Sequence, residues 1–279
     1  MPMSAVHPEH ACARLLKAGD PAQSLATAKD WVRQCPADAE ARIGLFQLLA
    51  VAGEWQRAQQ QLRLAAQLDQ SWGGVVAAYV RILDAELERE QVLAGQMMPL
   101  MPGQVLPWQH DLLQALQHDR DGESGHAARR RALALTQADA IAGHIDGQRF
   151  DWLADADPRF GPCLEVILEV GYAWVPFVQL RSLRFEAPTT LRDLLWQSVD
   201  VQWHDGTRSR GVVPCRYPDS QHSEEGAIRL GQRTEWEGEE LSACGLGQRL
   251  LAGSEDDYRV LDIRHIAFDT AAVEAPWPN

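Results

Sequence analysis

The feature that most constrains this chain is an internal repeat with a period of 34 residues. The segment LLKAGDPAQSLATAKDWVRQCPAD aligns with LLAVAGEWQRAQQQLRLAAQLDQ, so that Gly19 falls on Gly53 and Cys35 on Asp69. In both copies apolar residues recur at the i, i+3, i+4 spacing of amphipathic helices. A 34-residue period of paired helices is typical of tetratricopeptide (TPR) repeats. The sequence therefore predicts a TPR-like α/α superhelix in its N-terminal half.

A third and looser copy, LQHDRDGESGHAARRRALALTQAD, places Gly122 103 residues after Gly19, close to three periods. Before it, the apolar spacing predicts one long amphipathic helix over about residues 75–93. The segment 95–108, GQMMPLMPGQVLPW, is apolar, but its three prolines and two glycines exclude a regular helix. Its methionines either cap the helical core beneath an irregular loop or form an adaptable binding surface.

After about residue 145 the apolar period changes to 2, which is typical of strands. Residues 163–170 and 172–185 predict two strands joined at Gly171, and residues 199–217 predict a hairpin that turns at Asp205-Gly206. Further strands are predicted over 227–230 and 258–268, and one short helix over 191–196, capped by Thr190. We therefore expect an α+β protein of two domains: a TPR-like helical domain over residues 1–144 and a mainly β domain with one or two short helices over 145–279.

Charge excludes two classes of partner. The formal net charge is −13, and the charge is unevenly distributed along the chain. Residues 1–144 carry 13 basic and 16 acidic residues, a balance of −3. Residues 145–279 carry 13 basic and 23 acidic residues, a balance of −10. Binding to nucleic acid or to an anionic membrane needs a basic stripe, and the sequence contains none. We expect a partner that offers a basic or apolar protein surface.

The five cysteines are odd in number, widely spaced and without a CxxC pair. This pattern argues against a disulfide framework and a structural zinc site, and it suits a reducing compartment. The sequence has no signal peptide and no apolar stretch long enough to span a membrane. A cytoplasmic protein is expected.

No catalytic motif is present: GxSxG, HExxH, a Walker loop and SxxK are all missing, and Gly245-Leu246-Gly247 lacks the third glycine of a dinucleotide fingerprint. Several groups of histidines and carboxylates are interpreted as turn or loop residues rather than as ligands. They are His204 with Asp205, His222 with Glu224 and Glu225, His7 and His10 with Cys12, and Glu235, Glu237, Glu239 and Glu240 around Trp236. We predict no catalytic residue, cofactor or metal. A metal-dependent hydrolase that uses His204 or His222 with carboxylates of the β domain is an alternative.

Adaptable methionines and aromatic side chains are the candidate partner-binding residues. Aromatic residues of a small β domain mostly form its core, but a surface subset could form a docking patch. Two surfaces are open: a groove at the domain junction beside the methionines, or the aromatic rim of the β domain. The candidates are Met97, Met98, Leu100, Met101, Trp108, Trp174, Trp196 and Trp236.

Several stretches of the β half resemble the ImpE/SciE/TagJ family, the accessory proteins of bacterial type VI secretion. They are GYAWVPFVQLRSL, LRDLLWQSVDVQWHDG, VVPCRYPDS, IRLGQRTEW, GLGQRLL and LDIRHIAF, and the resemblance covers about residues 10–268. The residues that match the family pattern are Asp205, Gly206, Tyr217, Pro218, Arg229, Gly231, Thr234, Glu235, Trp236, Gly245, Gly247 and Arg249.

The resemblance implies a TPR-like domain joined to a β-rich domain and a non-enzymatic role in the cytoplasm. It also implies that the protein binds an N-terminal helix of the small contractile-sheath subunit (TssB/VipA) and is linked through it to the disassembly ATPase ClpV. A superhelix offers a concave face of the kind that receives an amphipathic helix. A general TPR scaffold or chaperone unrelated to secretion is the alternative within the binding proteins.

Overall fold

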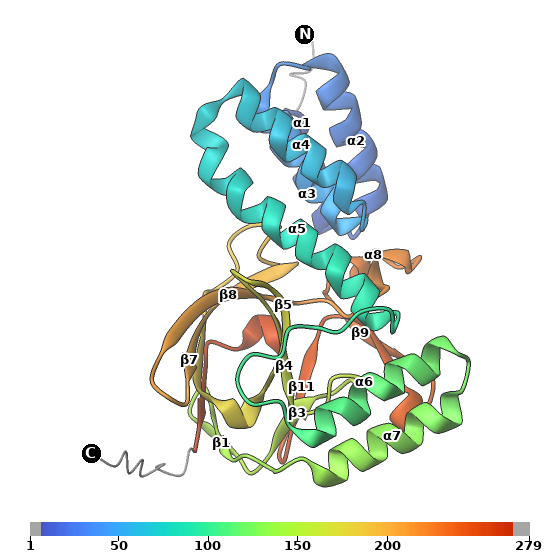
Figure 1. The fold of residues 1–279 in the computed structure, drawn as a ribbon. Coiled ribbons are helices and arrows are strands. Elements are labelled where there is room, and N and C mark those ends of the chain that lie inside the picture. Colours follow the sequence, from blue (N-terminus) through green and yellow to red (C-terminus); the bar gives the residue numbers. More distant parts are fainter. Residues whose placement is uncertain (1–6, 270–279) are drawn as a thin grey trace.

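The computed structural model describes residues 7–269, and the outer ends of both predicted domains, residues 1–6 and 270–279, lie outside the described residues. Within this range the N-terminal half is helical and the C-terminal half is a set of antiparallel sheets (Figure 1), so the predicted α+β class is confirmed. The helices are α1 (Pro8–Lys17), α2 (Pro21–Gln34), α3 (Ala39–Val51), α4 (Trp55–Leu68), α5 (Gly73–Leu93), α6 (Pro107–Arg120), α7 (Ser124–Gln137) and the short α8 (Gly226–Arg229).

Each copy of the sequence repeat forms a helical hairpin, α1–α2, α3–α4 and α6–α7. At each turn stands the aligned glycine in the left-handed conformation, with φ of 78° at Gly19, 71° at Gly53 and 77° at Gly122. The amide of the residue that follows each glycine reaches back five residues to a helix carbonyl, for example from Glu123 N to His118 O at 2.8 Å. The repeated glycine therefore marks the end of a helix, in a backbone conformation that only glycine adopts without strain.

The three hairpins do not form one continuous superhelix. Helices α1 to α5 pack in sequence order, each against the next, and α5 then runs down to the β half, where it contacts β5 (Gly171–Pro176). The hairpin α6–α7 lies beside the β half, away from α1–α4 (Figure 1). Helix α7 packs there on the 3-10 turn Glu240–Ser242. The third copy therefore keeps the local fold of the repeat but not its place in the stack.

Up to residue 269, the described part of the β half forms one sheet of eight strands and two small sheets. The order in the large sheet is β2-β1-β13-β6-β7-β8-β4-β5, and the small sheets are β10-β9 and β12-β11-β3. The remaining strand bounds are β1 (Gly143–Ile145), β2 (Gln148–Phe150), β3 (Leu153–Asp155), β4 (Cys163–Leu168), β6 (Leu180–Phe185), β7 (Trp196–Trp203), β8 (Arg208–Pro214), β9 (Thr234–Glu237), β10 (Cys244–Gly247), β11 (Leu250–Gly253), β12 (Asp257–Arg259) and β13 (His265–Phe268).

The predicted hairpins are confirmed. Strands β4 and β5 pair antiparallel across Gly171, and β7 and β8 pair across the Asp205-Gly206 turn, where Gly206 has φ of 86°. The Asp205 carboxylate accepts bonds from the Thr207 amide at 2.8 Å and the Thr207 hydroxyl at 2.6 Å. Both bonds lower the pKa of Asp205, and the bond from the Thr207 hydroxyl has the larger effect. They show that Asp205 is a turn residue.

Four local predictions are wrong. Residues 191–195 form turns instead of a helix, because Trp196 already enters β7 opposite Pro214 and leaves room for only one turn. Residues 227–230 lie mostly in α8 rather than in a strand, since Leu230 N bonds to Gly226 O. The expected single strands over 172–185 and 258–268 are each interrupted by a 3-10 turn, at Phe177–Gln179 and Val260–Asp262.

The apolar core continues from the helices into the sheet. One cluster of buried side chains includes Leu83 and Val92 of α5, Ile167 of β4, Trp174 of β5 and Trp196 of β7. The predicted boundary between residues 144 and 145 falls inside β1, and this strand begins six residues after the last residue of α7. Among residues 7–269, no helix has the length and apolarity needed to cross a bilayer.

Substitution of Gly122 by alanine tests the hairpin turn. A Cβ at Gly122 meets no atom within 4 Å, so only the positive φ opposes it. We expect Gly122→Ala to lower the free energy of unfolding by about 1 kcal/mol in urea denaturation. Gly125, in the first turn of α7, also has open space but no positive φ, so Gly125→Ala should cause no loss. Equal stability of the two variants would contradict the role of the turn.

Candidate partner-binding site

A groove of about 600 Å³ lies between the first three helices and the segment 189–192 of the β half. Its lining residues come from α1, α2, α3, the turn before α5 and the connection between β6 and β7. They are Glu9, Cys12, Ala13, Leu16, Ala28, Trp31, Glu40, Ile43, Gly44, Gln47, Leu48, Trp72, Thr189, Thr190, Leu191 and Arg192.

Small residues on the lining helices keep the groove open. Ala28 and Trp31 form part of its buried floor, and Ala13 is exposed on its wall. A Cβ added at Gly44 would meet the Trp31 ring at 3.4 Å, so a larger side chain at Gly44 would extend over that ring and fill the groove. The lining therefore has an apolar floor with space above it, as expected for a surface that receives apolar side chains.

The rim of the groove is charged. Glu9 and Glu40 are exposed at the helical side, and Arg192 stands on the side of the β half. The Arg192 guanidinium lies over the Tyr79 ring, 4.9 Å from its centroid, and its Nε and Nη1 are buried with no hydrogen-bond partner among the described residues. Buried donors without an acceptor are costly, and the contact with the Tyr79 ring compensates for part of this cost.

Asp193 holds the wall segment in place. Its carboxylate accepts bonds from the amides of Thr189 at 2.8 Å and Thr190 at 2.7 Å. Burial opposes the charged form of Asp193, but these bonds outweigh it and lower its pKa. The β half thus supplies a fixed wall to a groove that the helices alone would leave open on one side.

The methionine-rich segment predicted as a binding surface lies elsewhere, along the edge of β5. Leu100 N donates to Tyr172 O and Leu100 O accepts from Trp174 N, both at 2.9 Å, so the segment pairs with the outer edge of the sheet. Met97, Met98 and Leu100 have exposed side chains, whereas Met101 is half-buried against the core. The segment therefore covers an unpaired strand edge and leaves an apolar patch outside.

Three of the predicted docking tryptophans are core residues. Trp108, Trp174 and Trp196 are 5%, 0% and 1% exposed, so none of them lies on a surface, and this part of the prediction is wrong. Burial of their large rings in the cluster that joins helices and sheet is the reason. Trp236 is exposed, and its ring packs on Tyr217 with 5.6 Å between centroids.

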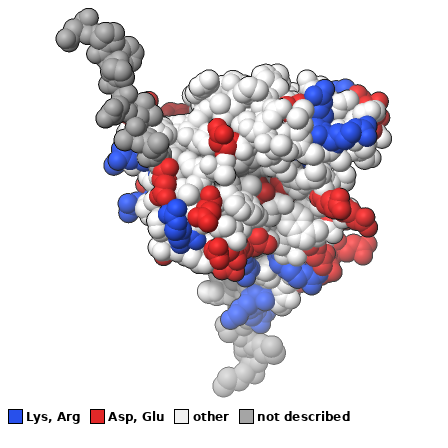
Figure 2. Space-filling view, turned by 90° about the horizontal axis from the view of Figure 1, so that it is seen from below, with Lys and Arg blue, Asp and Glu red and all other residues white. Residues whose placement is uncertain are grey.

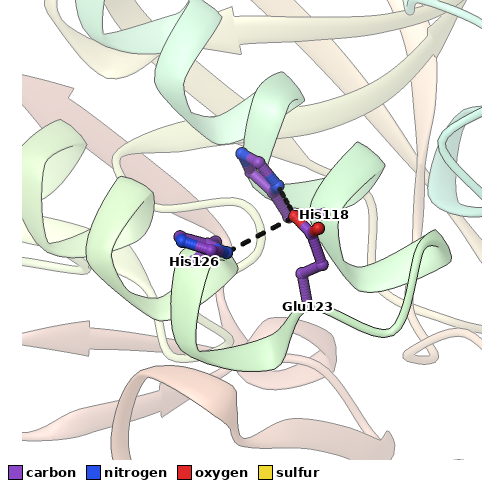
Figure 3. A group of neighbouring side chains, drawn as sticks. All are labelled: His118, Glu123 and His126. Carbon is purple, nitrogen blue, oxygen red and sulfur yellow. Dashed lines mark hydrogen bonds and ion pairs between the residues drawn. The ribbon is translucent and has the colours of Figure 1, made fainter.

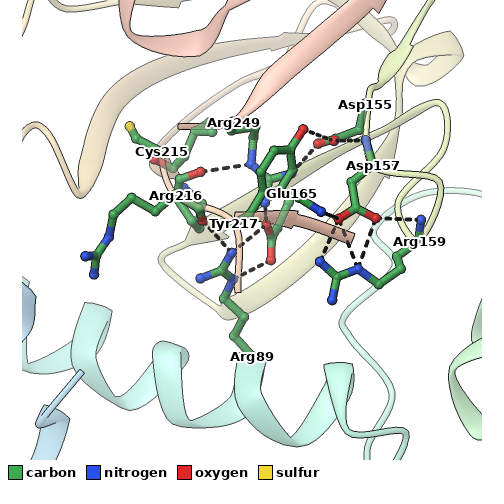
Figure 4. Close-up of polar contacts among 12 residues, drawn as sticks. Arg89, Asp155, Asp157, Arg159, Glu165, Cys215, Arg216, Tyr217 and Arg249 are labelled. Carbon is green, nitrogen blue, oxygen red and sulfur yellow. Dashed lines mark hydrogen bonds and ion pairs between the residues drawn. The ribbon is translucent and has the colours of Figure 1, made fainter. Parts of the chain in front are cut away.

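Two residues of the family pattern, Arg249 and Tyr217, belong to a buried network of charges (Figure 4). Arg249 bonds to Asp155 of β3 and to Glu165 of β4, and Arg89 of α5 donates from Nε to Glu165 Oε1 at 2.6 Å. Tyr217 donates to Asp155 Oδ1 at 2.9 Å. Burial favours neutral Glu165, but Arg249 and Arg89 outweigh it and lower its pKa. The ion pairs thus keep Glu165 charged inside the protein.

The same network ties the helices to the β half. Arg89 Nη2 donates to Arg216 O at 2.9 Å, and Arg216 Nη1 donates to Val51 O at the end of α3 at 3.1 Å. Trp196 Nε1 donates to Glu86 Oε1 of α5 at 2.6 Å. Among residues 7–269 no carboxylate bonds to Arg216, and burial lowers its pKa to about 10. Its hydrogen bonds to carbonyls compensate for part of this cost.

The pattern glycines fit the chain around Tyr217. A Cβ at Gly245 would overlap the Tyr217 ring, and one at Gly247, where φ is 87°, would overlap the carbonyl of Arg233. Thr234 Oγ1 donates to Gln248 O at 2.7 Å, and the Arg229 carbonyl accepts from Arg216. Gly231 has φ of 63°, Glu235 pairs with Arg233, and Pro218 follows Tyr217 directly. Most residues of the family pattern therefore stabilise the fold.

Among residues 7–269, the histidine and carboxylate groups considered in the sequence do not come together as a cluster of metal ligands. Glu225 pairs with Arg233 at 2.6 Å, His222 is exposed, and Cys12 is buried and donates to Ser24 O at 3.6 Å. Within residues 7–269, the structure brings together a different set, His118, Glu123 and His126, which the sequence analysis missed. The signal for it is the spacing H-x4-E-x2-H across the Gly122 turn.

On the face shown in Figure 2, basic side chains alternate with acidic ones and form no continuous basic stripe. That nucleic acid is a poor partner stays a prediction from the acidic composition.

Comparison with known proteins gives two sequence matches. A protein-family model described as "ImpE protein" matches residues 147–267. A protein of Pseudomonas aeruginosa, named "Type VI secretion system accessory component TagJ", is 40% identical over 255 residues, which cover 91% of this chain and 90% of the relative.

A solved structure shares the fold. The crystal structure of a protein from Vibrio parahaemolyticus superposes with a TM-score of 0.86 and covers 94% of this chain and 98% of its own, at 20% sequence identity. At this identity the likeness concerns the fold alone, including the arrangement of helical and β halves.

The buried network predicts that Glu165→Gln strongly destabilises the folded protein. This change keeps the shape of the side chain but leaves Arg89 and Arg249 with less opposing charge in the interior. We expect the free energy of unfolding to fall by about 3–5 kcal/mol in urea denaturation. As a control, Glu235→Gln breaks an exposed pair with Arg233 and should cost less than about 1 kcal/mol. Similar losses in the two variants would argue against the network.

The raised pKa of buried Asp155 predicts that the free energy of unfolding depends on pH. Burial raises its pKa from 3.8 to about 6, an effect larger than the opposing one of Arg249. Between these values the folded protein holds a proton that the unfolded chain has released, so this contribution to stability is present below about pH 4 and lost above about pH 6. Relative to Asp155→Asn, the unfolding free energy of the wild type should therefore fall by about 3 kcal/mol from pH 4 to pH 7. A constant difference over this range, measured by urea denaturation, would refute the assignment.

Proposed function

This chain belongs to the ImpE family of type VI secretion accessory proteins, and we propose that it acts as a non-enzymatic cytoplasmic adaptor that binds the N-terminal helix of the small sheath subunit (TssB/VipA). Through this subunit it is linked indirectly to ClpV-driven disassembly of the sheath. The observation that carries the proposal is the groove of about 600 Å³ between α1–α3 and the segment 189–192, which has an apolar floor.

The groove has the properties that a bound amphipathic helix requires. Such a helix inserts apolar side chains at i, i+3, i+4 and i+7. The floor around Trp31, Ile43 and Leu48 is buried and apolar, and Leu16 and Leu191 are half-buried on its walls. Three or four anchors at about 1.5–3 kcal/mol each, less the cost of association, correspond to a dissociation constant of about micromolar order.

Charge at the rim favours a particular helix. Glu9 and Glu40 would attract basic residues that flank the apolar stripe, in keeping with the net charge of −13. On the opposite side, Arg192 would place a positive charge beside an acidic residue of the helix. Together they would set the direction in which the helix lies.

The exposed residues Met97, Met98 and Leu100, with Trp236, stay predicted partner-binding residues and are an alternative surface for the same helix. The groove lining includes none of them. Separate substitutions can therefore distinguish the groove from the methionine-rich segment as the place where the helix binds.

Titration of a fluorescently labelled peptide, the N-terminal helix of the cognate small sheath subunit, tests the proposal. We expect wild-type protein to bind at about micromolar concentration. Gly44→Leu should weaken binding at least about tenfold, because the new side chain fills the groove over Trp31. Leucine is a better helix former than glycine, so α3 itself should not be weakened.

Gly125→Leu is the matched control: it makes the same change in α7, where a Cβ meets open space, and should leave the affinity unchanged. The double variant Met97→Ser/Met98→Ser should also bind normally. If it loses binding while Gly44→Leu does not, the helix binds the methionine-rich segment and the groove assignment is wrong. No binding by the wild type at about 100 μM would overturn the proposed function.

A further inference from the structure

The hairpin α6–α7 brings two histidines and a glutamate together at its turn (Figure 3). His118 lies near the end of α6, Glu123 follows the turn glycine Gly122, and His126 lies in the first turn of α7. Nδ1 of His118 is 2.7 Å from Glu123 Oε2, and Nδ1 of His126 is 3.4 Å from the same oxygen. One ligand atom from each residue lies within 4.8 Å of the other two.

The backbone of the turn fixes this arrangement. The amide of Glu123 bonds to His118 O and the amide of His126 bonds to Glu123 O, both at 2.8 Å. The two imidazole rings lie 5.4 Å apart between centroids and are tilted by 35°. Because the three residues belong to one rigid turn, little ordering is needed for their ligand atoms to meet at one point.

Neighbouring charges leave the cluster available. Arg120 pairs with Asp121 and Arg130 pairs with Asp111, so these cations are engaged elsewhere. In the described part of the chain, the ion-pair partners of Glu123 are the two histidines alone. All three side chains are partly exposed, between 31% and 58%, and an ion in solution can reach them.

We propose that His118, Glu123 and His126 form a binding site for a divalent transition-metal ion, with Zn²⁺ as the ion that fits the ligands best. Two imidazoles and one carboxylate are ligands of borderline hardness, which suit Zn²⁺ and its neighbours rather than Ca²⁺ or Mg²⁺. Three protein ligands leave a fourth position of the tetrahedron for water. The short distances between the ligand atoms match one ion after small side-chain rotations.

Binding at this position would clamp the end of α6 to the start of α7. The hairpin closes on itself through the turn at Gly122 and contacts the β half through α7, where Arg131 donates to Leu241 O at 3.1 Å. None of the three ligands lines the groove between α1–α3 and the segment 189–192. The metal site is therefore separate from the proposed helix-binding groove, and each can be tested without the other.

Isothermal titration of the untagged full-length protein with ZnCl₂ tests the site. We expect one ion bound per chain and a rise in the thermal unfolding midpoint that EDTA reverses, because the ion binds the folded hairpin. His118→Ala and His126→Ala should each weaken Zn²⁺ binding at least about tenfold. With Co²⁺ in place of Zn²⁺, the wild type should show a visible absorption that both variants lose.

His110→Ala is the matched control, since it removes an exposed histidine from the same helix without touching the cluster. It should bind Zn²⁺ as the wild type does. Circular dichroism of the three variants checks that α6 and α7 stay folded. No Zn²⁺ binding by the wild type up to about 100 μM would overturn the proposal. Unchanged binding in both His118→Ala and His126→Ala would overturn it as well.

Discussion

The structure depends on Glu165, a carboxylate that is fully buried in the sheet and yet charged. Arg249 and Arg89 approach it from two sides, one from the β half and one from α5, and Tyr172 donates to it as well. A buried charge without partners would cost several kcal/mol, so the helix and the sheet must keep their relative position for the carboxylate to stay paired. The network thus fixes how the halves lie relative to each other, together with the apolar cluster to which both halves contribute.

The groove depends on that alignment. Its floor comes from α1–α3, but one of its walls is the segment 189–192, which the large sheet positions between β6 and β7. The hydrogen bonds from Arg216 to the end of α3 and the close approach of Gly226 to Gly19 hold the β half against the same helices. The groove therefore belongs to neither half alone, because residues of both halves line it.

Parts of the fold could be predicted because they rest on local rules. The glycines of the 34-residue repeat mark helix ends with positive φ, and the Asp205-Gly206 turn marks a hairpin. Predictions failed where distant contacts decide. Residues 191–195 start like a helix, but pairing of Trp196 with Pro214 ends it after one turn. Trp174 and Trp196, predicted as docking residues, are buried because α5 and the sheet meet over them.

The helical hairpins, the antiparallel strands, the acidic balance and the membership of the ImpE family could all be predicted from the amino-acid sequence. Each of these follows from spacing along the chain, from composition or from a motif. The place of the third hairpin, the apolar residues that stay exposed and the charged residues that meet inside became known only from the folded structure. The reason is that burial and ion pairing depend on contacts between residues far apart in sequence. Arg89 and Glu165 stand 76 positions apart, and no local pattern in the chain indicates that they meet.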